Sequence, residues 1–390
     1  MIHFKTIDTK TFLKDYWQKK PLIIRQALPD FINPLSPDEL AGLALEDEVE
    51  SRLVLETPNS APYWQLKTGP FLESDFSTLP KTHWTLLVQG VDRLIPDVAS
   101  LLNHFDFIPQ WRIDDVMISY AVNQGSVGPH YDNYDVFLYQ ASGQRLWSLT
   151  TKDCNQENYL NDVELRIMNR FEVEEEFLLE AGDMLYLPPH VGHHGVSQSD
   201  DCMTYSFGYR SYQGVELWNS YGDYLADQNN SLLYKDPDWS EGQATSEISS
   251  SALLNAKRVM QQLLGNEQQM KSWFGSFITS LDQQAELQLA LPLTDDEVVD
   301  LPNFINELAA SEGMMRDAGC RFAYYDDDDL QLFVNGCAWD ISDVDHVLIK
   351  YVANNRFVAI DKLQPFLTQQ DNQIFLFELW KLQWLYWPES

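Results

Sequence analysis

Cysteine is scarce in this chain: only four of its 390 residues are cysteines, and none stands in a Cys-Xaa-Xaa-Cys pair. The four are scattered along the sequence, at Cys154, Cys202, Cys320 and Cys337. Thiols with this distribution argue against the framework of a small disulfide-linked domain, and they favour reduced thiols in a reducing compartment.

Long apolar runs are also missing. No stretch reaches the length that a membrane-spanning helix requires, and the opening run Met1-Ile2-His3-Phe4-Lys5 lacks the apolar core of a signal peptide. We therefore expect a cytoplasmic protein without a membrane partner.

Positive charge is the third shortage. Lys and Arg number 26 against 59 Asp and Glu, so the formal net charge is −33. Nucleic acid is a poor partner for such a surface, because each bound phosphate requires a cation. An acidic surface attracts basic proteins and peptides. The alternative is that the acidity only keeps the protein soluble, and composition leaves both interpretations open.

In much of the first half of the chain, apolar and polar residues follow the pattern of β-strands. Hydrophobic residues make up 44% of the sequence and aromatic residues 13%, enough for well-filled cores in two or three domains. A helix is expected at residues 9–20, and strands at 22–24 and 84–89. From 114 to 212 the pattern is all β, with turn signals at Ser142-Gly143 and Ala181-Gly182. This predicts a double-stranded β-helix, a jelly-roll whose mouth can hold a metal.

The second half changes period. Apolar spacing predicts helices at 215–226, 250–264 and 268–281, with a polar loop at 236–247. Further helices are expected at 304–317, 344–353 and 357–367, and strands at 320–325 and 330–334, with Asn335-Gly336 as a hairpin turn. This order resembles a winged helix. The four aspartates at 326–329 would repel phosphate, so we expect a solvated turn there and no DNA partner.

A His-Xaa-Asp triplet is the strongest chemical signal. His130 and Asp132 are two residues apart, so on a strand their side chains point to the same face. A second, distant imidazole would complete a 2-His-1-carboxylate triad, which holds Fe(II) and leaves positions open for a co-substrate and dioxygen. The alternative is an ordinary pair at a strand edge, because such triplets are common by chance.

Three histidines compete to be the third ligand: His190, His193 and His194. Their spacing would place all three on one side of a helix, as in some zinc sites. The prolines before them and the glycines beside them argue against a regular helix. The residues alone leave this choice open.

The surrounding motifs resemble the core of Jumonji-C (JmjC) oxygenases, and more narrowly the bacterial ribosomal oxygenases of the cupin superfamily. The matching blocks are Met117-Ile118-Ser119-Tyr120, 125–137, Gly143-Gln144-Arg145-Leu146-Trp147, 182–189, 205–210 and the opening 12–25. They span about residues 12 to 212, and beyond that point the match is architectural.

The resemblance implies an α+β protein. Its core would be a double-stranded β-helix (jelly-roll, cupin/JmjC), followed by a helical dimerisation region and a C-terminal winged-helix-like module. The implied domains are residues 1–212 for the JmjC catalytic domain, 213–300 for the helical dimerisation region and 301–390 for the winged-helix-like domain. A homodimer follows from the same resemblance.

The resemblance also implies the metal ligands His130, Asp132 and His193. The family pattern Pro-Pro-Xaa-Xaa-Xaa-His-Xaa-Gly selects His193, with His194 as the next choice. This chain departs from the pattern at two positions: His190 replaces a glycine, and His194 replaces an acidic or polar residue. His190 is then expected at the mouth of the site or simply exposed.

For the co-substrate, the resemblance implies Arg145 and Ser119. A planar guanidinium can hold a carboxylate in bidentate fashion, as the far end of 2-oxoglutarate requires, and the serine hydroxyl would assist at the same carboxylate. The alternative for Arg145 is that it covers aromatic surface beside Trp147.

The implied function is that of an Fe(II)- and 2-oxoglutarate-dependent dioxygenase. It would use O2 to hydroxylate C3 of an arginine in the sixteenth protein of the large ribosomal subunit, a basic partner that suits the charge of −33. The same chemistry on a histidine of another ribosomal protein, or N-methyl-lysine demethylation, is an alternative. A cupin enzyme that uses no 2-oxoglutarate, such as an isomerase, and a non-enzymatic adaptor are two others. Succinate release and the mass change of the substrate discriminate among them.

Overall fold

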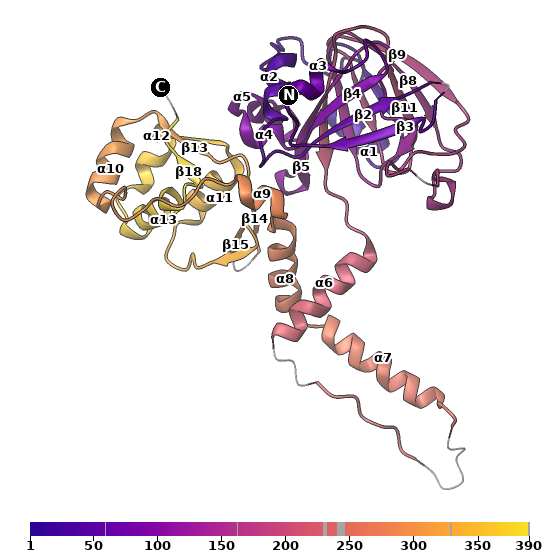
Figure 1. Ribbon diagram of the computed structural model, residues 1–390. Coiled ribbons are helices and arrows are strands. Elements are labelled where there is room, and N and C mark those ends of the chain that lie inside the picture. The colour runs from indigo at the N-terminus through magenta and orange to yellow at the C-terminus, as the bar shows by residue number, and fades with distance from the viewer. Residues whose placement is uncertain (59, 162, 229–231, 240–245, 328–329, 389–390) are drawn as a thin grey trace. The chain divides into compact units, whose positions relative to one another are not determined.

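The computed structural model describes all of the chain except residues 59, 162, 229–231, 240–245, 328–329 and 389–390 (Figure 1). Its contacts divide the chain into two compact units. The first combines residues 1–211, 281–320 and 354–390, and the second combines 212–280 and 321–353. The division into three domains, after residues 212 and 300, stays a prediction.

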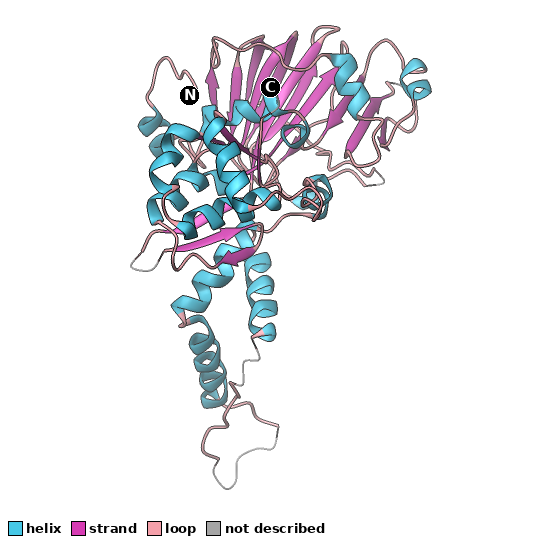
Figure 2. Cartoon of the chain, turned by 90° about the vertical axis from the view of Figure 1, so that its left-hand side faces the viewer, coloured by secondary structure: helices cyan, strands magenta, loops and turns pink. Residues whose placement is uncertain are grey.

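Two antiparallel sheets form the double-stranded β-helix of the first unit, which the sequence predicts (Figure 2). The larger sheet has the spatial order β1 (Leu22–Ile24), β10 (Met184–Leu187), β7 (Val136–Ser142), β12 (Cys202–Tyr209), β5 (Ile113–Ala121), β4 (Trp84–Val88), β2 (Ser51–Glu56) and β3 (Trp64–Thr68). The smaller sheet has the order β6 (His130–Tyr131), β11 (Gly192–Ser197), β8 (Gln144–Thr150) and β9 (Glu175–Glu180). The predicted turns are confirmed: Gly143 and Gly182 have φ of 68° and 95°, a conformation that glycine adopts without strain.

Strand β7 contributes to a core on each face of the larger sheet. Phe137 and Tyr139 lie in an outer, aromatic core, where the ring centroids of Phe137 and Tyr186 are 4.9 Å apart. Val136 and Leu138 point the other way, into the apolar core between the two sheets. The alternation of a strand therefore explains why this segment is apolar without interruption.

Short helices cover the outer core. They are α1 (Thr9–Asp15), α2 (Pro37–Leu43), α3 (Glu73–Ser77), α4 (Val91–Leu94), α5 (Pro96–Leu101) and the 3₁₀ helices η1 (Leu102–Phe105) and η2 (Gln110–Arg112), while η3 (Gln156–Asn158) lies between β8 and β9. Helix α1 begins at Asp8, whose carboxylate accepts a hydrogen bond from the amide of Thr11 at 2.7 Å. Its predicted extension to residue 20 is wrong, because the chain passes through a left-handed residue at Gln18 (φ 56°).

The second unit contains the three helices predicted after residue 212. They are α6 (Gly214–Asp227), α7 (Ser250–Leu264) and α8 (Glu267–Thr279). A three-stranded antiparallel sheet of β14 (Phe322–Tyr325), β15 (Gln331–Val334) and β16 (Cys337–Trp339) follows later in the chain, and after it comes helix α11 (His346–Asn354). The turn at Asn335-Gly336 is confirmed, with φ of 48° and 83°. Of the predicted polar loop 236–247, residues 240–245 lie outside the described residues, as do 328 and 329 of the four aspartates. The other two aspartates, Asp326 and Asp327, pair with lysines.

The C-terminal segments of the first unit form a small α/β layer. Its elements are α9 (Gln283–Gln288), α10 (Leu301–Ala310), β13 (Gly313–Arg316), β17 (Phe357–Ala359), α12 (Ile360–Leu363), η4 (Gln364–Phe366), α13 (Gln370–Lys381) and β18 (Leu385–Tyr386). Two predicted helices are partly wrong here. Residues 313–316 and 357–359 are paired strands, in which Met315 lies opposite Phe357. None of the helices that the structure describes is both long and apolar enough to cross a membrane.

Candidate metal centre and adjoining cavity

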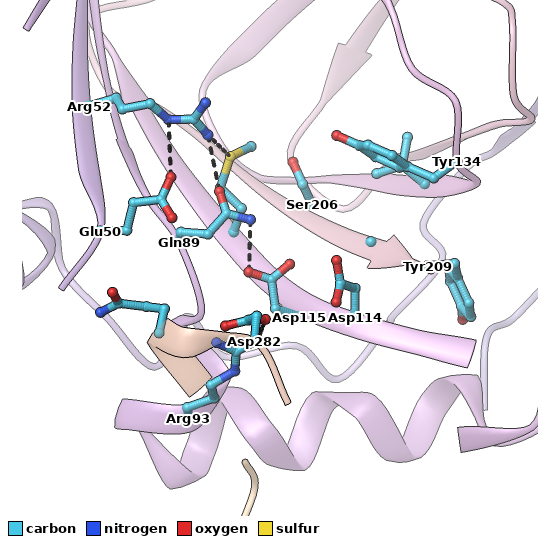
Figure 3. Close-up of a pocket in the computed structure, with 14 residues that line it drawn as sticks. Glu50, Arg52, Gln89, Arg93, Asp114, Asp115, Tyr134, Ser206, Tyr209 and Asp282 are labelled. Atoms are coloured by element: carbon cyan, nitrogen blue, oxygen red, sulfur yellow. Dashed lines mark hydrogen bonds and ion pairs between the residues drawn. The ribbon is translucent and has the colours of Figure 1, made fainter. Parts of the chain in front are cut away.

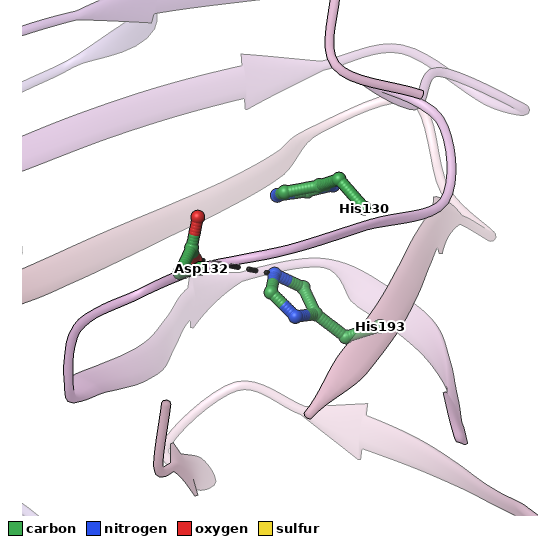
Figure 4. Close-up of side chains that lie close together, drawn as sticks. All are labelled: His130, Asp132 and His193. Carbon is green, nitrogen blue, oxygen red and sulfur yellow. Dashed lines mark ion pairs between the residues drawn. The ribbon is translucent and has the colours of Figure 1, made fainter. Parts of the chain in front are cut away.

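The register of two short strands brings His130 and His193 together. Strand β6 pairs with β11 so that these residues lie opposite each other, with ring centroids 4.2 Å apart. Asp132 follows β6 directly, and its Oδ2 lies 3.6 Å from Nε2 of His193. One potential ligand atom from each residue lies within 4.8 Å of the other two (Figure 4). This arrangement can hold one metal ion.

Backbone carbonyls fix the orientation of both imidazoles. Nδ1 of His130 lies 2.9 Å from the carbonyl oxygen of Gly128, and Nδ1 of His193 lies 3.0 Å from that of Val191. A carbonyl oxygen can only accept a hydrogen bond, so each Nδ1 carries a proton, and in the neutral ring Nε2 then keeps its lone pair. Both rings therefore have the tautomer that a metal requires at Nε2.

The pKa of His193 supports the same state. The residue is 3% exposed, and burial, followed by repulsion from His130, lowers its pKa to about 4. The side chain is consequently neutral near pH 7. A neutral imidazole is the form that coordinates metals.

The other two candidate histidines lie apart from this cluster. His194 is the next residue on β11, and its ring packs near Phe171, with centroids 6.1 Å apart. His190 is exposed and stacks on Tyr131 at 5.7 Å. Among the described residues, His193 is thus the histidine of this group that joins His130 and Asp132.

Arg145 is buried without a partner for most of its guanidinium. The residue is 3% exposed, and its Nε and Nη2 atoms have no hydrogen-bond partner within the described part of the chain. On β8, Arg145 lies opposite Ser197 of β11, and Trp147, two residues later, lies opposite Gly195. Strand alternation puts Arg145 on the same face of the smaller sheet as His193, which is the face toward the interior. The guanidinium carbon is 5.8 Å from the Trp147 ring, so the contact with aromatic surface that the sequence suggested is also present.

Ser119 lies on the larger sheet, on β5. It is 6% exposed and lies opposite Thr204 of β12, whose hydroxyl donates a hydrogen bond to Oε1 of Gln140 at 3.3 Å. No hydrogen bond joins Ser119 to Arg145 among the described residues. The structure therefore gives both residues buried positions but not a direct contact.

An acidic cavity of about 350 Å³ adjoins this region (Figure 3). Tyr134, two residues after Asp132, lines it together with Met117 and Val136. Its charged lining residues are the carboxylates of Glu50, Asp114, Asp115 and Asp282 and the guanidinium groups of Arg52 and Arg93. Acids outnumber bases, so the cavity suits a cationic group with an apolar stem.

Asp115 is the most buried acid of this lining, at 5% exposure. Its Oδ2 accepts hydrogen bonds of 2.8 Å from the amide of Gly90 and from Nε2 of Gln89. Burial, then repulsion from Asp114 and Asp92, raises its pKa to about 7. Such a carboxylate gains strongly from a cation that binds beside it.

These cavity residues are not among the site residues predicted from the sequence. The adjacent acids Asp114 and Asp115 stand at the start of a predicted strand, where alternation must turn one of them inward, and that signal was available. Asp282 gave no signal, because only the packing of α9 brings it to the cavity.

Two family models match this chain. The family model of the JmjC domain matches residues 100–217, and that of the ROXA-like winged helix matches residues 258–386. The Escherichia coli (strain K12) ribosomal protein uL16 3-hydroxylase is 35% identical over 335 residues, which cover 85% of each chain. A probable ribosomal oxygenase of Haemophilus influenzae is 30% identical and covers 85% of this chain and 81% of its own length.

A solved structure is also similar over the full length. It is the structure of YcfD, a ribosomal oxygenase from Escherichia coli, in complex with cobalt and 2-oxoglutarate. It has 31% sequence identity and a TM-score of 0.84, and the match covers 98% of this chain and 99% of that one.

Proposed function

This chain belongs to the ribosomal oxygenases that carry a JmjC domain, and from that premise we propose that it hydroxylates an arginine of ribosomal protein uL16 at C3. Its cofactor would be Fe(II), and its co-substrates 2-oxoglutarate and O2. The choice of uL16 is supported by the name of the Escherichia coli relative, and the choice of co-substrate by the YcfD complex.

The proposed chemistry rests chiefly on one observation, the buried guanidinium of Arg145 with two nitrogens that lack a hydrogen-bond partner among the described residues. An isolated buried cation costs several kcal/mol of free energy, roughly, unless a ligand or a side chain compensates it. The unpartnered Nε and Nη2 of Arg145 match the two oxygens of a carboxylate. An isomerase that uses no 2-oxoglutarate would give this arginine no partner.

The donor set fits Fe(II). Two imidazoles and one carboxylate are the ligands of non-haem iron oxygenases, and here one ligand atom from each of the three residues lies within 4.8 Å of the other two. His130, Asp132 and His193 would hold the ion, and Arg145 would hold the far carboxylate of 2-oxoglutarate, with the Ser119 hydroxyl assisting at the same end. Bound together, iron and 2-oxoglutarate supply the oxidation of a C–H bond by dioxygen.

The cavity residues would then select and position the substrate. Oδ1 of Asp115 would accept hydrogen bonds from the guanidinium of the target arginine, and Met117, Val136 and Tyr134 would pack around its methylene groups. Holding the side chain in this way fixes which carbon faces the metal, and it excludes water from the site. A histidine substrate gains less from Asp115, because a neutral imidazole brings no charge to the carboxylate.

The proposal is tested on whole ribosomal proteins. The protein is incubated with Fe(II), 2-oxoglutarate and a mixture of ribosomal proteins, and succinate release and peptide masses are measured. We expect one added oxygen atom on one arginine of uL16. An added oxygen on a histidine, or the loss of a methyl group from a lysine, would show that the substrate residue is not arginine and would favour one of the alternative activities.

We also propose a homodimer formed through the second unit. Its helices carry large apolar side chains that this unit leaves exposed, including Val215 (62%), Trp218 (49%), Leu253 (54%) and Leu254 (48%). A two-fold axis would let the same surface of a second copy cover them.

We further propose that the protein acts in the cytoplasm and binds neither nucleic acid nor a membrane. The support for this is the ribosomal substrate, the scarcity and scatter of the four cysteines, and the net charge of −33. In the winged-helix module, Lys271 and Lys350 are paired with Asp327 and Asp326, so neither is free for a phosphate.

A further inference from the structure

One wall of the acidic cavity comes from a segment far along the chain from the metal centre. Asp282 and Gln284, at the start of α9, line the cavity. The helix is held against the turn that precedes β2, because Gln284 and Gln288 both donate hydrogen bonds from their amide groups to the carbonyl of Glu48. Ala285, on the inner side of the helix, is fully buried. The position of Asp282 is therefore set by this packing.

The two oxygens of Asp282 have different partners. Oδ1 accepts a hydrogen bond of 2.7 Å from the amide of Ala285 and so caps α9. Oδ2 lies 3.8 Å from Nη2 of Arg93, and this is the ion pair that the structure describes for Arg93. The carboxylate thus connects the end of one helix to a guanidinium on another.

Arg93 is a buried cation beside two buried acids. Its side chain is 6% exposed, and it follows Asp92 on α4. Asp92 is 3% exposed and accepts a hydrogen bond of 2.7 Å from the amide of Val116. Burial raises the pKa of both Asp92 and Asp115, and the positive charge of Arg93 opposes this rise in each. The guanidinium therefore acts on Asp115 without an ion pair to it.

We propose that Asp282 is a positioning residue for substrate recognition: it holds the guanidinium of Arg93 aside, so that Asp115 stays open to the guanidinium of the substrate. This inference rests on the proposed function, in which the substrate is an arginine. The side chain of Arg93 carries the same guanidinium group as the substrate arginine and is always charged. It can therefore compete with the substrate for the carboxylate of Asp115. Without the charge of Asp282, Arg93 turns toward Asp115 and occupies its free oxygen.

The test is the substitution Asp282→Asn. Asparagine caps a helix as well as aspartate does, so α9 keeps its N-cap while the charge that holds Arg93 is lost. We expect the KM for a uL16 peptide to rise about fivefold, with kcat and the KM for 2-oxoglutarate unchanged. The matched control is Asp295→Asn, which removes the same charge at an exposed residue outside the cavity lining and leaves the peptide KM as it is.

A second substitution separates positioning from direct contact. In the double variant Asp282→Asn with Arg93→Gln, the competitor is gone, and we expect the peptide KM to return toward the wild-type value. These assays are run roughly two pH units above the raised pKa of Asp115, so that losing the charge of Arg93 does not protonate it. An unchanged KM in Asp282→Asn, or no recovery in the double variant, overturns the inference.

A separate probe distinguishes this failure from a failure of the proposed function. The affinity of N-acetyl-arginine methylamide is measured by calorimetry on the same variants. If wild-type protein transfers no oxygen to uL16, the proposed function fails, yet the order of affinities for the probe still decides the role of Asp282. Equal affinities in wild type and Asp282→Asn would contradict the positioning role whatever the substrate is.

Discussion

At the scale of single residues, the two imidazoles of the candidate centre are oriented by backbone carbonyls. The carbonyls of Gly128 and Val191 hold Nδ1 of His130 and His193. Side-chain substitutions nearby therefore leave the tautomers unchanged, and the identity of the three ligands becomes directly testable.

His193→Ala should abolish Fe(II)-dependent turnover, because it removes one of three protein ligands. We expect kcat/KM to fall by more than about 100-fold, since the loss of residues that only orient metal ligands already costs 10- to 100-fold. The measurement is succinate release, together with titration of Co(II) as a spectroscopic probe. The control is His194→Ala, which lies outside the cluster; loss of Co(II) binding in this variant but not in His193→Ala would reverse the assignment.

Arg145→Ala should raise the KM for 2-oxoglutarate roughly tenfold to a hundredfold, because hydrogen bonds to a charged group contribute about 1.5–3 kcal/mol. Lysine at this position should restore only part of the affinity, since a point charge lacks the planar fork of arginine. The exposed Arg170 is the control, and Arg170→Ala should leave the KM as it is. Normal binding of 2-oxoglutarate by Arg145→Ala would mean that the anchor is elsewhere.

Much of this site could be predicted at the residue scale, but not all of it. Alternation along a strand was enough to pair His130 with Asp132. The choice of His193 over His194 came from resemblance, because only the register of β6 with β11 puts one of two adjacent histidines opposite His130. The partnership of Asp282 with Arg93 depends on how α9 packs, and sequence carries no local sign of it.

At the scale of elements, the close approach of β11 to β8 depends on a glycine. A β-carbon on Gly195 would lie 2.7 Å from atoms of the Trp147 ring, which packs beside Arg145. The missing side chain therefore makes room for the indole that fills the interior next to the proposed co-substrate anchor.

Gly195→Ala should destabilise the protein by about 1–3 kcal/mol, the usual cost of overpacking a core. The free energy of unfolding is measured with urea. In the control Gly42→Ala, nothing lies within 4 Å of the new β-carbon in α2, and we expect a gain of about 0.5–1 kcal/mol. Equal stabilities of Gly195→Ala and wild type would show that Trp147 moves without cost.

Two of the wrongly predicted elements, the helices expected over 304–317 and 357–367, share one cause. Residues 313–316 and 357–359 were assigned to helices because apolar residues there continue a helical spacing. Met314 is fully buried in β13, a strand that pairs with β17 on one side and β18 on the other. Pairing between segments so far apart in the chain outweighs local periodicity, whereas α6 and α7, which have no strand to pair with, follow their periodicity closely.

At the scale of the whole molecule, exposed apolar surface predicts the oligomeric state. The mass in solution at micromolar concentration should be twice the chain mass of 45.1 kDa. Replacing Leu253 and Leu254 by Lys should give a monomer with unchanged helix content, because charge on both chains would face the axis. The control Ile32→Lys changes an 86% exposed residue of the first unit and should remain dimeric. A monomeric wild type would contradict the dimer.

The central claim is that one interior joins a metal triad, a 2-oxoglutarate anchor and an arginine cavity. It is tested most directly by supplying purified uL16 with Fe(II), 2-oxoglutarate and isotopically labelled dioxygen, and by fragmenting the product in a mass spectrometer. The predicted result is one labelled oxygen atom on C3 of a single arginine for each succinate released, lost in His193→Ala. Succinate released at the same rate with and without uL16, and no label on any arginine, would contradict the account.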